Sequence, residues 1–382
     1  MPQPPETPLR LLVVAPSWVG DVVMATPALR RLRDQLPGAT IAVLPKPGVA
    51  AVLDGLDSFD QLITSHPGGM MGHKHTASKL RQHRFDTALL LTNSFSTALT
   101  ARMAGIPRRI GYDRDGRGLL LTHRLRAPKR GGDWAIVPAV DYYWHAASAV
   151  LGVPCGEVAG DLQPANERGD HRLPAGAHLE LGVSDADRAK ADELLRAAGI
   201  EDDRFVILNP GGNNPAKRWP AERFAELAHR LQRDHGMRVL INGSPAEAEL
   251  AAEIAAMADG DAGQSLGPVS LPAIGGTLGG LKALVGRAAL LVTNDTGPRH
   301  FAAALGTPVV TLFGPTDHRW TTIPTRPTGP EAVLVADPDL PAGESANDHP
   351  ERCRVDRITL ERVVRAAEEV LGAASGTGNA GA

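Results

Sequence analysis

Cysteine is scarce in this chain, and so are aromatic residues. Cys155 and Cys353 are the two cysteines among 382 residues, and they form no Cys-x-x-Cys pair. A disulfide framework and a cysteine-ligated zinc site are therefore not expected, which fits a reducing compartment. Aromatic residues make up 4% of the chain, and this disfavours binding of long polymers through stacked aromatic side chains.

The chain also lacks a charge excess and a long hydrophobic run. Its formal net charge is −3 and its isoelectric point lies near 6.5, so it has no overall electrostatic footprint for nucleic acid. The first ten residues, MPQPPETPLR, are polar and contain no apolar segment typical of a secretory signal. The longest apolar runs have the length of a strand, so no membrane-spanning helix is expected. We therefore expect a soluble cytoplasmic protein.

Apolar runs of strand length alternate with helical patterns in both halves of the chain. This alternation predicts an α/β protein with two parallel sheets. We predict strands at 11–15, 40–44, 61–65, 87–92, 205–210, 237–243, 289–295 and 308–314. We predict helices at 26–35, 78–83, 221–235, 245–258, 279–287 and 298–305.

A segment rich in glycine, proline and charge at 156–185 predicts the join between two domains. We place the first domain at 1–170 and the second at 171–357. An amphipathic helix is expected at 358–372, and the small polar residues of 373–382 predict a disordered tail.

The loop after the first predicted strand, PSWVGDVV, carries the first candidate site residue. Gly20 allows a tight turn and a close approach of a ligand. Asp21 either caps the following helix, the commoner role for such an aspartate, or acts as a general base toward an incoming hydroxyl. The loop contains neither GxGxxG nor GxxxxGK[ST], so a nicotinamide dehydrogenase is disfavoured.

A second candidate stretch, LNPGGNNPAKRWP, follows the first strand of the second predicted sheet. Its glycine-rich backbone amides lie beside Lys217, a combination that suits a phosphate or diphosphate. Lys217 is equally well explained as a surface residue from this stretch alone. Arg218 and Trp219 are more readily explained as a surface cation and a packing aromatic.

A third stretch, NDTGPRH, lies where another strand of that sheet ends and a helix begins. Thr296 and Gly297 offer backbone amides at the helix start, where an anion binds well. Asp295 either caps the helix or accepts a hydrogen bond from a sugar hydroxyl. His300 lies one turn further on and is either structural or part of the same site.

Four histidines gather between His66 and His83, but the spacing of histidine and acid that marks a helical zinc site is missing. We interpret this segment as a mobile loop whose composition would suit an anionic acceptor. The Asp-x-Asp pairs of the chain are attributed to chance, so no metal site is expected.

Four motifs in order, PSWVGD, NSFSTALTARMAGIPRRIGY, NPGGNNPAKRWP and NDTGPRHFAAALGTPVVTLFGPTD, extend over most of the chain. Together they resemble the ADP-heptose:lipopolysaccharide heptosyltransferases, and the first three are closest to the heptosyltransferase II type. The resemblance implies a GT-B fold, with two Rossmann-like domains whose parallel sheets face a central cleft. It also implies that the first domain binds the acceptor and that the second binds the nucleotide sugar. The C-terminal helix is expected to return to the first domain.

The resemblance also implies roles for single residues. The implied catalytic residues are Asp21, which would deprotonate the acceptor hydroxyl, and Lys217, which would contact the phosphates of the donor. Glu247 would bind ribose hydroxyls. The implied donor-binding residues are Gly212, Asn213, Glu247, Thr277, Leu278, Asp295, Thr296, Gly297 and His300. We further predict Trp18, Gly20 and Asn93 as acceptor-binding residues.

The activity implied is transfer of a heptose from ADP-heptose to a hydroxyl of the lipopolysaccharide inner core, with inversion and without cofactor or metal. The expected partners are the nucleotide sugar and a lipid-anchored saccharide, reached from the cytosolic face of the inner membrane. Segments 66–83 and 318–346 differ from the enterobacterial pattern. Two alternatives stay open, a GT-B enzyme for another nucleotide sugar or acceptor and a two-lobed sugar-binding module without catalysis.

Overall fold

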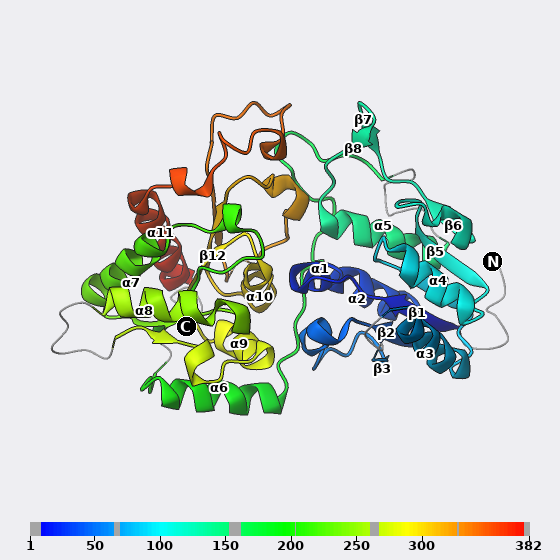
Figure 1. Cartoon of the computed structure of the whole chain (residues 1–382), viewed down its shortest axis with the longest axis horizontal. Coiled ribbons are helices and arrows are strands. Elements are labelled where there is room, and N and C mark those ends of the chain that lie inside the picture. The colour runs from blue at the N-terminus through cyan, green and yellow to red at the C-terminus, as the bar shows by residue number, and fades with distance from the viewer. Residues whose placement is uncertain are drawn as a thin grey trace. The chain divides into compact units, whose positions relative to one another are not determined.

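The computed structural model describes residues 9–64, 69–152, 162–202, 204–259, 267–326 and 328–377. The chain forms two compact units (Figure 1). The first comprises Met1–Glu180 and Arg319–Ile323, and the second comprises Leu181–His318 and Pro324–Ala382. The boundary therefore lies at 180–181 and not at the predicted 170–171, and a short later segment belongs to the first unit.

The first unit is built on a six-stranded parallel sheet with the strand order β3-β2-β1-β4-β5-β6. Successive residues of a strand point to opposite faces, and all residues from Leu11 to Val14 are buried. Both faces of the central strand are therefore covered, which explains its uninterrupted apolar sequence. The strands are β1 (Arg10–Val14), β2 (Thr40–Leu44), β3 (Gln61–Leu62), β4 (Thr87–Leu90), β5 (Arg108–Tyr112) and β6 (His123–Leu125).

In the described part of the first unit, α-helices and a hairpin accompany this sheet. Buried alanine and leucine side chains of α3 and α4 pack on one face of the sheet, while α5 contacts β4, β5, α1 and α2. The helices are α1 (Val19–Met24), α2 (Thr26–Gln35), α3 (Gly69–Gln82), α4 (Phe95–Met103) and α5 (Ala139–Leu151). The antiparallel hairpin consists of β7 (Lys129–Arg130) and β8 (Asp133–Trp134).

The second unit repeats this architecture with the strand order β11-β10-β9-β12-β13-β14, again all parallel. The order matches that of a doubly wound sheet, in which ligands bind beyond the carboxyl ends of the strands. The strands are β9 (Phe205–Asn209), β10 (Arg238–Ile241), β11 (Val269–Ser270), β12 (Leu290–Asn294), β13 (Val309–Phe313) and β14 (Glu331–Val335).

Helices α7, α8 and α11 share one hydrophobic core with the strands of the second sheet. A capping box of Ser184 and Asp187 begins α6, whose side chains pack against α9. The helices are α6 (Asp185–Ala197), α7 (Ala221–His235), α8 (Ala248–Ala258), α9 (Leu278–Val285), α10 (Gly297–Leu305) and α11 (Leu360–Thr377).

Three expectations from the sequence need correction. The segment 66–83 was expected to be a mobile loop, although a helix was also predicted at 78–83. Its residues 69–82 form α3, with Ala77 and Leu80 buried, so the helix is longer than predicted; 66–68 lie outside the described residues. Helix α11 packs on β12, β13, β14 and α7 of the second unit and is not assigned to the first. It also continues to Thr377 into the expected tail, of which 378–382 lie outside the described residues.

Segment 318–346 contains η6 (His318–Thr321) and the edge strand β14. Within the described part of the chain, no helix combines the length and the apolar character that crossing a membrane would require.

Candidate active site

Asp21 lies in the first turn of α1, where the chain leaves the carboxyl end of β1. The residue in the N-cap position is Trp18, with an extended backbone, so Asp21 is the third residue of the helix and not its cap. The capping role that its position suggested is therefore wrong. A carboxylate in the first turn is still favoured by the positive end of the helix.

The carboxylate of Asp21 is held by a tyrosine from a distant part of the chain. The hydroxyl of Tyr143, on α5, donates a hydrogen bond of 2.9 Å to Asp21 Oδ1. Burial, and then the nearby charge of Asp21, hold the pKa of Tyr143 well above its usual value. Tyr143 therefore keeps its proton and acts as the donor in this hydrogen bond, and the Asp21 side chain is partly exposed.

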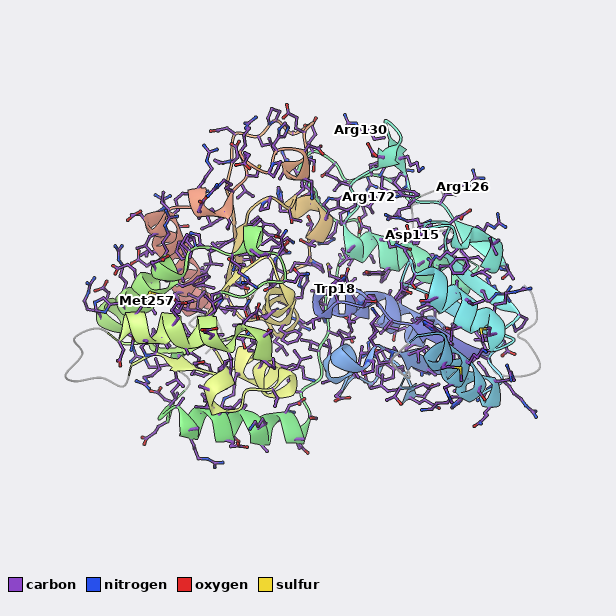
Figure 2. The ribbon with its side chains drawn as sticks, viewed as in Figure 1. Trp18, Asp115, Arg126, Arg130, Arg172 and Met257 are labelled. Carbon is purple, nitrogen blue, oxygen red and sulfur yellow. The ribbon has the colours of Figure 1, made fainter. Side chains whose placement is uncertain are left out.

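The expected acceptor-binding residues all lie near the carboxyl edge of the first sheet. Trp18 is 64% exposed and is drawn at the start of α1 in Figure 2, whereas Gly20 is buried beneath the helix start. Asn93 follows β4, the strand next to β1. Its Oδ1 accepts hydrogen bonds of 3.0 Å from Tyr142 Oη and from Arg117 Nη2, so its amide oxygen is fixed from two sides.

Lys217 and Asp295 meet at the corresponding edge of the second sheet. Lys217 ends the short helix η3 (Pro215–Lys217), and its Nζ lies 2.9 Å from Asp295 Oδ2. Asp295 follows β12 directly, and Thr296, not Asp295, occupies the N-cap position of α10. The structure thus brings Lys217, predicted to be catalytic, and Asp295, predicted to bind the donor, into one ion pair although they lie far apart in sequence.

Buried asparagines hold the loops that carry these two residues. Asn209 Nδ2 donates to Thr293 Oγ1 at 3.0 Å and to Thr296 Oγ1 at 2.8 Å. Asn294 donates to the carbonyl of Pro210 at 2.7 Å and accepts from the backbone N–H of Trp219 at 3.2 Å. Sequence reasoning missed both asparagines, although a polar residue that ends a buried apolar strand is a usable signal.

Glu247 is engaged by the backbone and by a neighbouring serine. Its Oε1 accepts from the N–H of Gly212 at 2.6 Å, and its Oε2 accepts from the N–H and hydroxyl of Ser244 at 2.8 and 2.7 Å. Burial alone would raise the pKa of Glu247, but the hydrogen bonds from Ser244 and Gly212 outweigh it and lower the pKa. A Cβ at Gly211 would come within 2.5 Å of this carboxylate, so a larger residue there would displace the Glu247 side chain.

The side chains near Lys217 differ in their burial and in their contacts. Trp219 is 2% exposed and packs edge-on against Phe224, as a packing aromatic should. Arg218 is more than a surface cation, because its Nε donates to the carbonyl of Gly212 at 2.8 Å. Asn213 is exposed in the loop.

The chain matches the sequence model of glycosyltransferase family 9 (heptosyltransferase) over residues 74–348. This chain belongs to glycosyltransferase family 9. The family 9 protein is therefore an enzyme, a glycosyltransferase, and its two parallel six-stranded sheets form the GT-B fold expected from the sequence.

Individual relatives agree with the family assignment. Lipopolysaccharide heptosyltransferase 2 of Escherichia coli is 29% identical over 82% of this chain and 85% of its own length. Lipooligosaccharide heptosyltransferase 2 of Haemophilus ducreyi is 27% identical over 95% and 99%. The solved structure of E. coli ADP-heptose lps heptosyltransferase II superposes with a TM-score of 0.73 at 28% identity, covering 95% of this chain and 98% of that one.

His300 of this family 9 enzyme is a buried base in the first turns of α10. It is 3% exposed, and neither ring nitrogen has a hydrogen-bond partner. Burial lowers the pKa of His300 from 6.5 to about 4, so its ring is neutral at neutral pH. A buried polar ring without a partner is uncommon in folded proteins, and its place just after Thr296 and Gly297 keeps it among the candidate site residues.

The nucleoside-facing positions expected in the family 9 enzyme lie at the start of α9. Thr277 caps this helix, its Oγ1 accepting from the N–H of Gly280 at 3.1 Å, and Leu278 is the first helical residue. The observed role of Thr277 is thus structural, and contact with a base stays a prediction. Across the described ranges, histidine, cysteine, aspartate and glutamate form no group of three or more that could hold a metal ion.

Proposed function

We propose that this glycosyltransferase moves a heptose from ADP-heptose to a hydroxyl of the lipopolysaccharide inner core and inverts the anomeric centre. The geometric observation that carries the proposal is the Asp21 carboxylate, which caps no helix and is oriented by Tyr143. The donor and the acceptor come from the likeness to heptosyltransferase 2 enzymes over most of the chain.

The second unit would hold the donor through its diphosphate. The backbone amides at the start of α10 and the ammonium of Lys217 suit two negatively charged phosphates. In the structure Asp295 neutralises Lys217, so the diphosphate would replace this carboxylate as the partner of Lys217. Asp295 would then accept a hydrogen bond from the donor sugar, and Glu247 would serve the ribose.

The reaction needs one base and stabilisation of one leaving group. Asp21 takes the proton of the acceptor hydroxyl, and the resulting oxygen nucleophile attacks the anomeric carbon from the face opposite ADP. The bond between that carbon and the β-phosphate oxygen breaks, and its electron pair stays with ADP. Lys217 and the amides of Thr296 and Gly297 would stabilise the developing charge, so we propose that the enzyme needs neither metal nor another cofactor.

The first unit carries a surface suited to a lipid-anchored acceptor. Four large apolar side chains are exposed in segments that follow β1, β3, β4 and β5, hence near one edge of the sheet. They are Trp18 at 64%, Met71 at 62%, Phe95 at 45% and Leu119 at 70% exposure. Apolar side chains of this kind insert into the interfacial region of a bilayer. We propose peripheral contact of this edge with the cytosolic face of the membrane.

Nucleotide binding tests the donor half of the proposal. Titration with ADP, UDP and GDP should show selective binding of ADP to the wild type and weaker binding to Lys217→Ala. Arg365→Ala removes an exposed cation of α11 in the same unit and should bind ADP like the wild type. A preference for UDP or GDP would keep the fold and refute ADP-heptose as the donor.

Turnover tests the chemistry. With ADP-heptose and an inner-core acceptor, Asp21→Asn should lower kcat by about 10²- to 10⁴-fold, the usual contribution of a general base, and leave ADP affinity unchanged. Activity should persist in the presence of EDTA. Full activity of Asp21→Asn would refute the role of this carboxylate, and intact binding without any turnover would favour a binding module.

A further inference from the structure

The three tyrosines of the chain lie together in the first unit. The chain contains 3 tyrosines in all, Tyr112 at the end of β5 and Tyr142 and Tyr143 on α5. The rings of Tyr112 and Tyr142 stack at 3.7 Å between centroids, and those of Tyr142 and Tyr143 meet edge to face at 5.9 Å. All three phenol groups of the chain therefore lie in one cluster, although aromatic residues are scarce in the sequence.

Each of the three hydroxyls makes a different hydrogen bond. Tyr112 donates to the carbonyl of Tyr142 at 2.8 Å, and Tyr142 donates to Asn93 Oδ1 at 3.0 Å. Tyr143 donates to the carboxylate of Asp21 at 2.9 Å. Tyr143 therefore connects the aromatic cluster to the proposed base.

A buried guanidinium anchors the cluster from the other side. Arg117 is fully buried, and its Nε donates to the carbonyl of Tyr112 at 2.9 Å while its Nη2 donates to Asn93 at 3.0 Å. A third donor, Nη1, reaches the carbonyl of Thr92. Burial lowers the pKa of Arg117 to about 10, so the group stays charged at neutral pH. Side chains tied in this way lose little of their orientation to thermal motion.

We propose that Tyr143 is a positioning residue for the glycosyl transfer, which holds the Asp21 carboxylate in the orientation needed to take the proton of the acceptor hydroxyl. The inference rests on the proposed function, since it assumes that Asp21 is the base. The hydroxyl of Tyr143 touches no substrate in this scheme. It acts through the hydrogen bond to Asp21 Oδ1.

Several of the other charged groups on the elements around α1 have partners of their own. Helix α1 packs against η1 (Pro47–Val52), α2 and α5. From α2, Arg30 pairs with Asp57 and Glu180, and Arg31 lies 4.4 Å from the ring of Trp144. Among the remaining ionisable groups, Arg33 on α2 pairs with Asp60, Asp141 on α5 accepts a hydrogen bond from the backbone of Arg172, and His145 on α5 is hydrogen-bonded to Tyr112. The others on these elements and their flanks are Lys46 before η1, Asp34 on α2 and Tyr142 on α5.

The test is the pH profile of transfer by Tyr143→Phe. A hydrogen bond from an O–H group favours the charged form of a carboxylate, so its loss should move the acidic limb of kcat/KM upward by about one pH unit. The kcat value at the optimum should fall about tenfold, the effect of losing a hydrogen bond to a charged group. The dissociation constant for ADP should not change.

Tyr112→Phe is the matched control, because it removes a buried hydroxyl of the same cluster without touching Asp21. Its acidic limb should coincide with that of the wild type. Fluorotyrosine at position 143 keeps the ring and makes the hydroxyl a stronger donor, so it should move the limb in the opposite direction. A limb in Tyr143→Phe that stays where it is in the wild type, or moves equally in Tyr112→Phe, overturns the proposal.

A second readout needs no substrate and separates this inference from the proposed function. The ¹³C resonance of the Asp21 carboxyl, identified by its absence in Asp21→Asn, should titrate about one pH unit higher in Tyr143→Phe than in the wild type. If this shift is seen but the enzyme does not turn over ADP-heptose, the result supports the positioning of Asp21 by Tyr143 and refutes only ADP-heptose as the donor. Identical titration curves would overturn the positioning role, whatever the donor is.

Discussion

Acidification should destabilise the second unit through His300. The imidazole is buried without a hydrogen-bond partner, and burial lowers its pKa from 6.5 to about 4. Above pH 6.5 the ring is neutral in both the folded and the unfolded chain, so it adds no pH dependence. Between pH 6.5 and 4 the unfolded chain takes up a proton that the folded chain refuses, and the free energy of unfolding falls as the pH falls.

The magnitude follows from the size of the pKa change. Each pKa unit corresponds to about 1.4 kcal/mol, so the burial of His300 should remove about 3 kcal/mol of stability between pH 7 and pH 4. That is a large share of the total for a domain whose stability is about 5–15 kcal/mol. The glutamine in His300→Gln cannot take up a proton, so the free energy of unfolding of this variant should fall by about 3 kcal/mol less than that of the wild type between pH 7 and pH 4.

The second unit can be followed separately because the tryptophans are unevenly distributed. Trp219 is the single one of the 5 tryptophans assigned to the second unit. Urea unfolding of fluorotryptophan-labelled protein, followed by ¹⁹F NMR at several pH values, therefore reports each unit. His123→Gln changes an exposed histidine of the first unit and serves as control. Parallel pH profiles for the wild type and His300→Gln, measured at Trp219, would refute the reasoning.

Three further predictions concern buried polar groups. Glu331→Gln should lower the unfolding free energy by about 3 kcal/mol, because it leaves the guanidinium of Arg299, 2% exposed, without its carboxylate; a loss below about 1 kcal/mol in urea unfolding would contradict this. Burial raises the pKa of Asp141 from 3.8 to about 6, so stability is lost as the pH rises through this range, and Asp141→Asn should melt higher than the wild type at pH 7.5 but not at pH 4. Trp219→Phe loses the hydrogen bond of 2.8 Å to the carbonyl of Ile358 and should cost about 2 kcal/mol in thermal unfolding, while unchanged stability would show that this bond is dispensable.

The parallel sheets could be predicted from sequence because their central strands are buried on both faces. Runs such as LLVV and FVIL carry this signal within a few residues. Strand β5, with the sequence RRIGY, escaped prediction because two arginines begin it. The guanidinium of Arg109 is accommodated by backbone carbonyls, among them that of Leu120 at 2.7 Å, and no local pattern shows such partners.

The first half of helix α3 was mistaken for a loop for a related reason. Glycine and histidine weaken the helical signal of its first half, while its buried contacts from Ala77 and Leu80 come from the rest of the unit. The edge strand β14 lies in a proline-rich stretch and pairs only with β13 in the described sheet. In both α3 and β14, tertiary packing outweighs the weak helix or strand propensity of the local sequence.

The residues proposed for the site could be selected from the sequence one by one, but their arrangement could not be predicted. The motifs located Asp21, Lys217 and Asp295 because each follows a strand at a carboxyl edge. Nothing in the sequence joins Asp21 to Tyr143, which lies 122 positions away. Nor does it show that the carboxylate of Glu247 is already occupied by backbone amides. Such pairings arise from the fold alone.

The ion pair between Lys217 and Asp295 has a consequence for discrimination among cellular anions. A small anion that approaches Lys217 must compete with a carboxylate already in contact with it at 2.9 Å. Orthophosphate brings few additional contacts to offset the loss of that pair, whereas a nucleotide diphosphate ester brings a second phosphate, a nucleoside and a sugar. In the proposed donor site, the resting pair would therefore favour large ligands over small ones, because only a ligand with several further contacts would offset the loss of the pair.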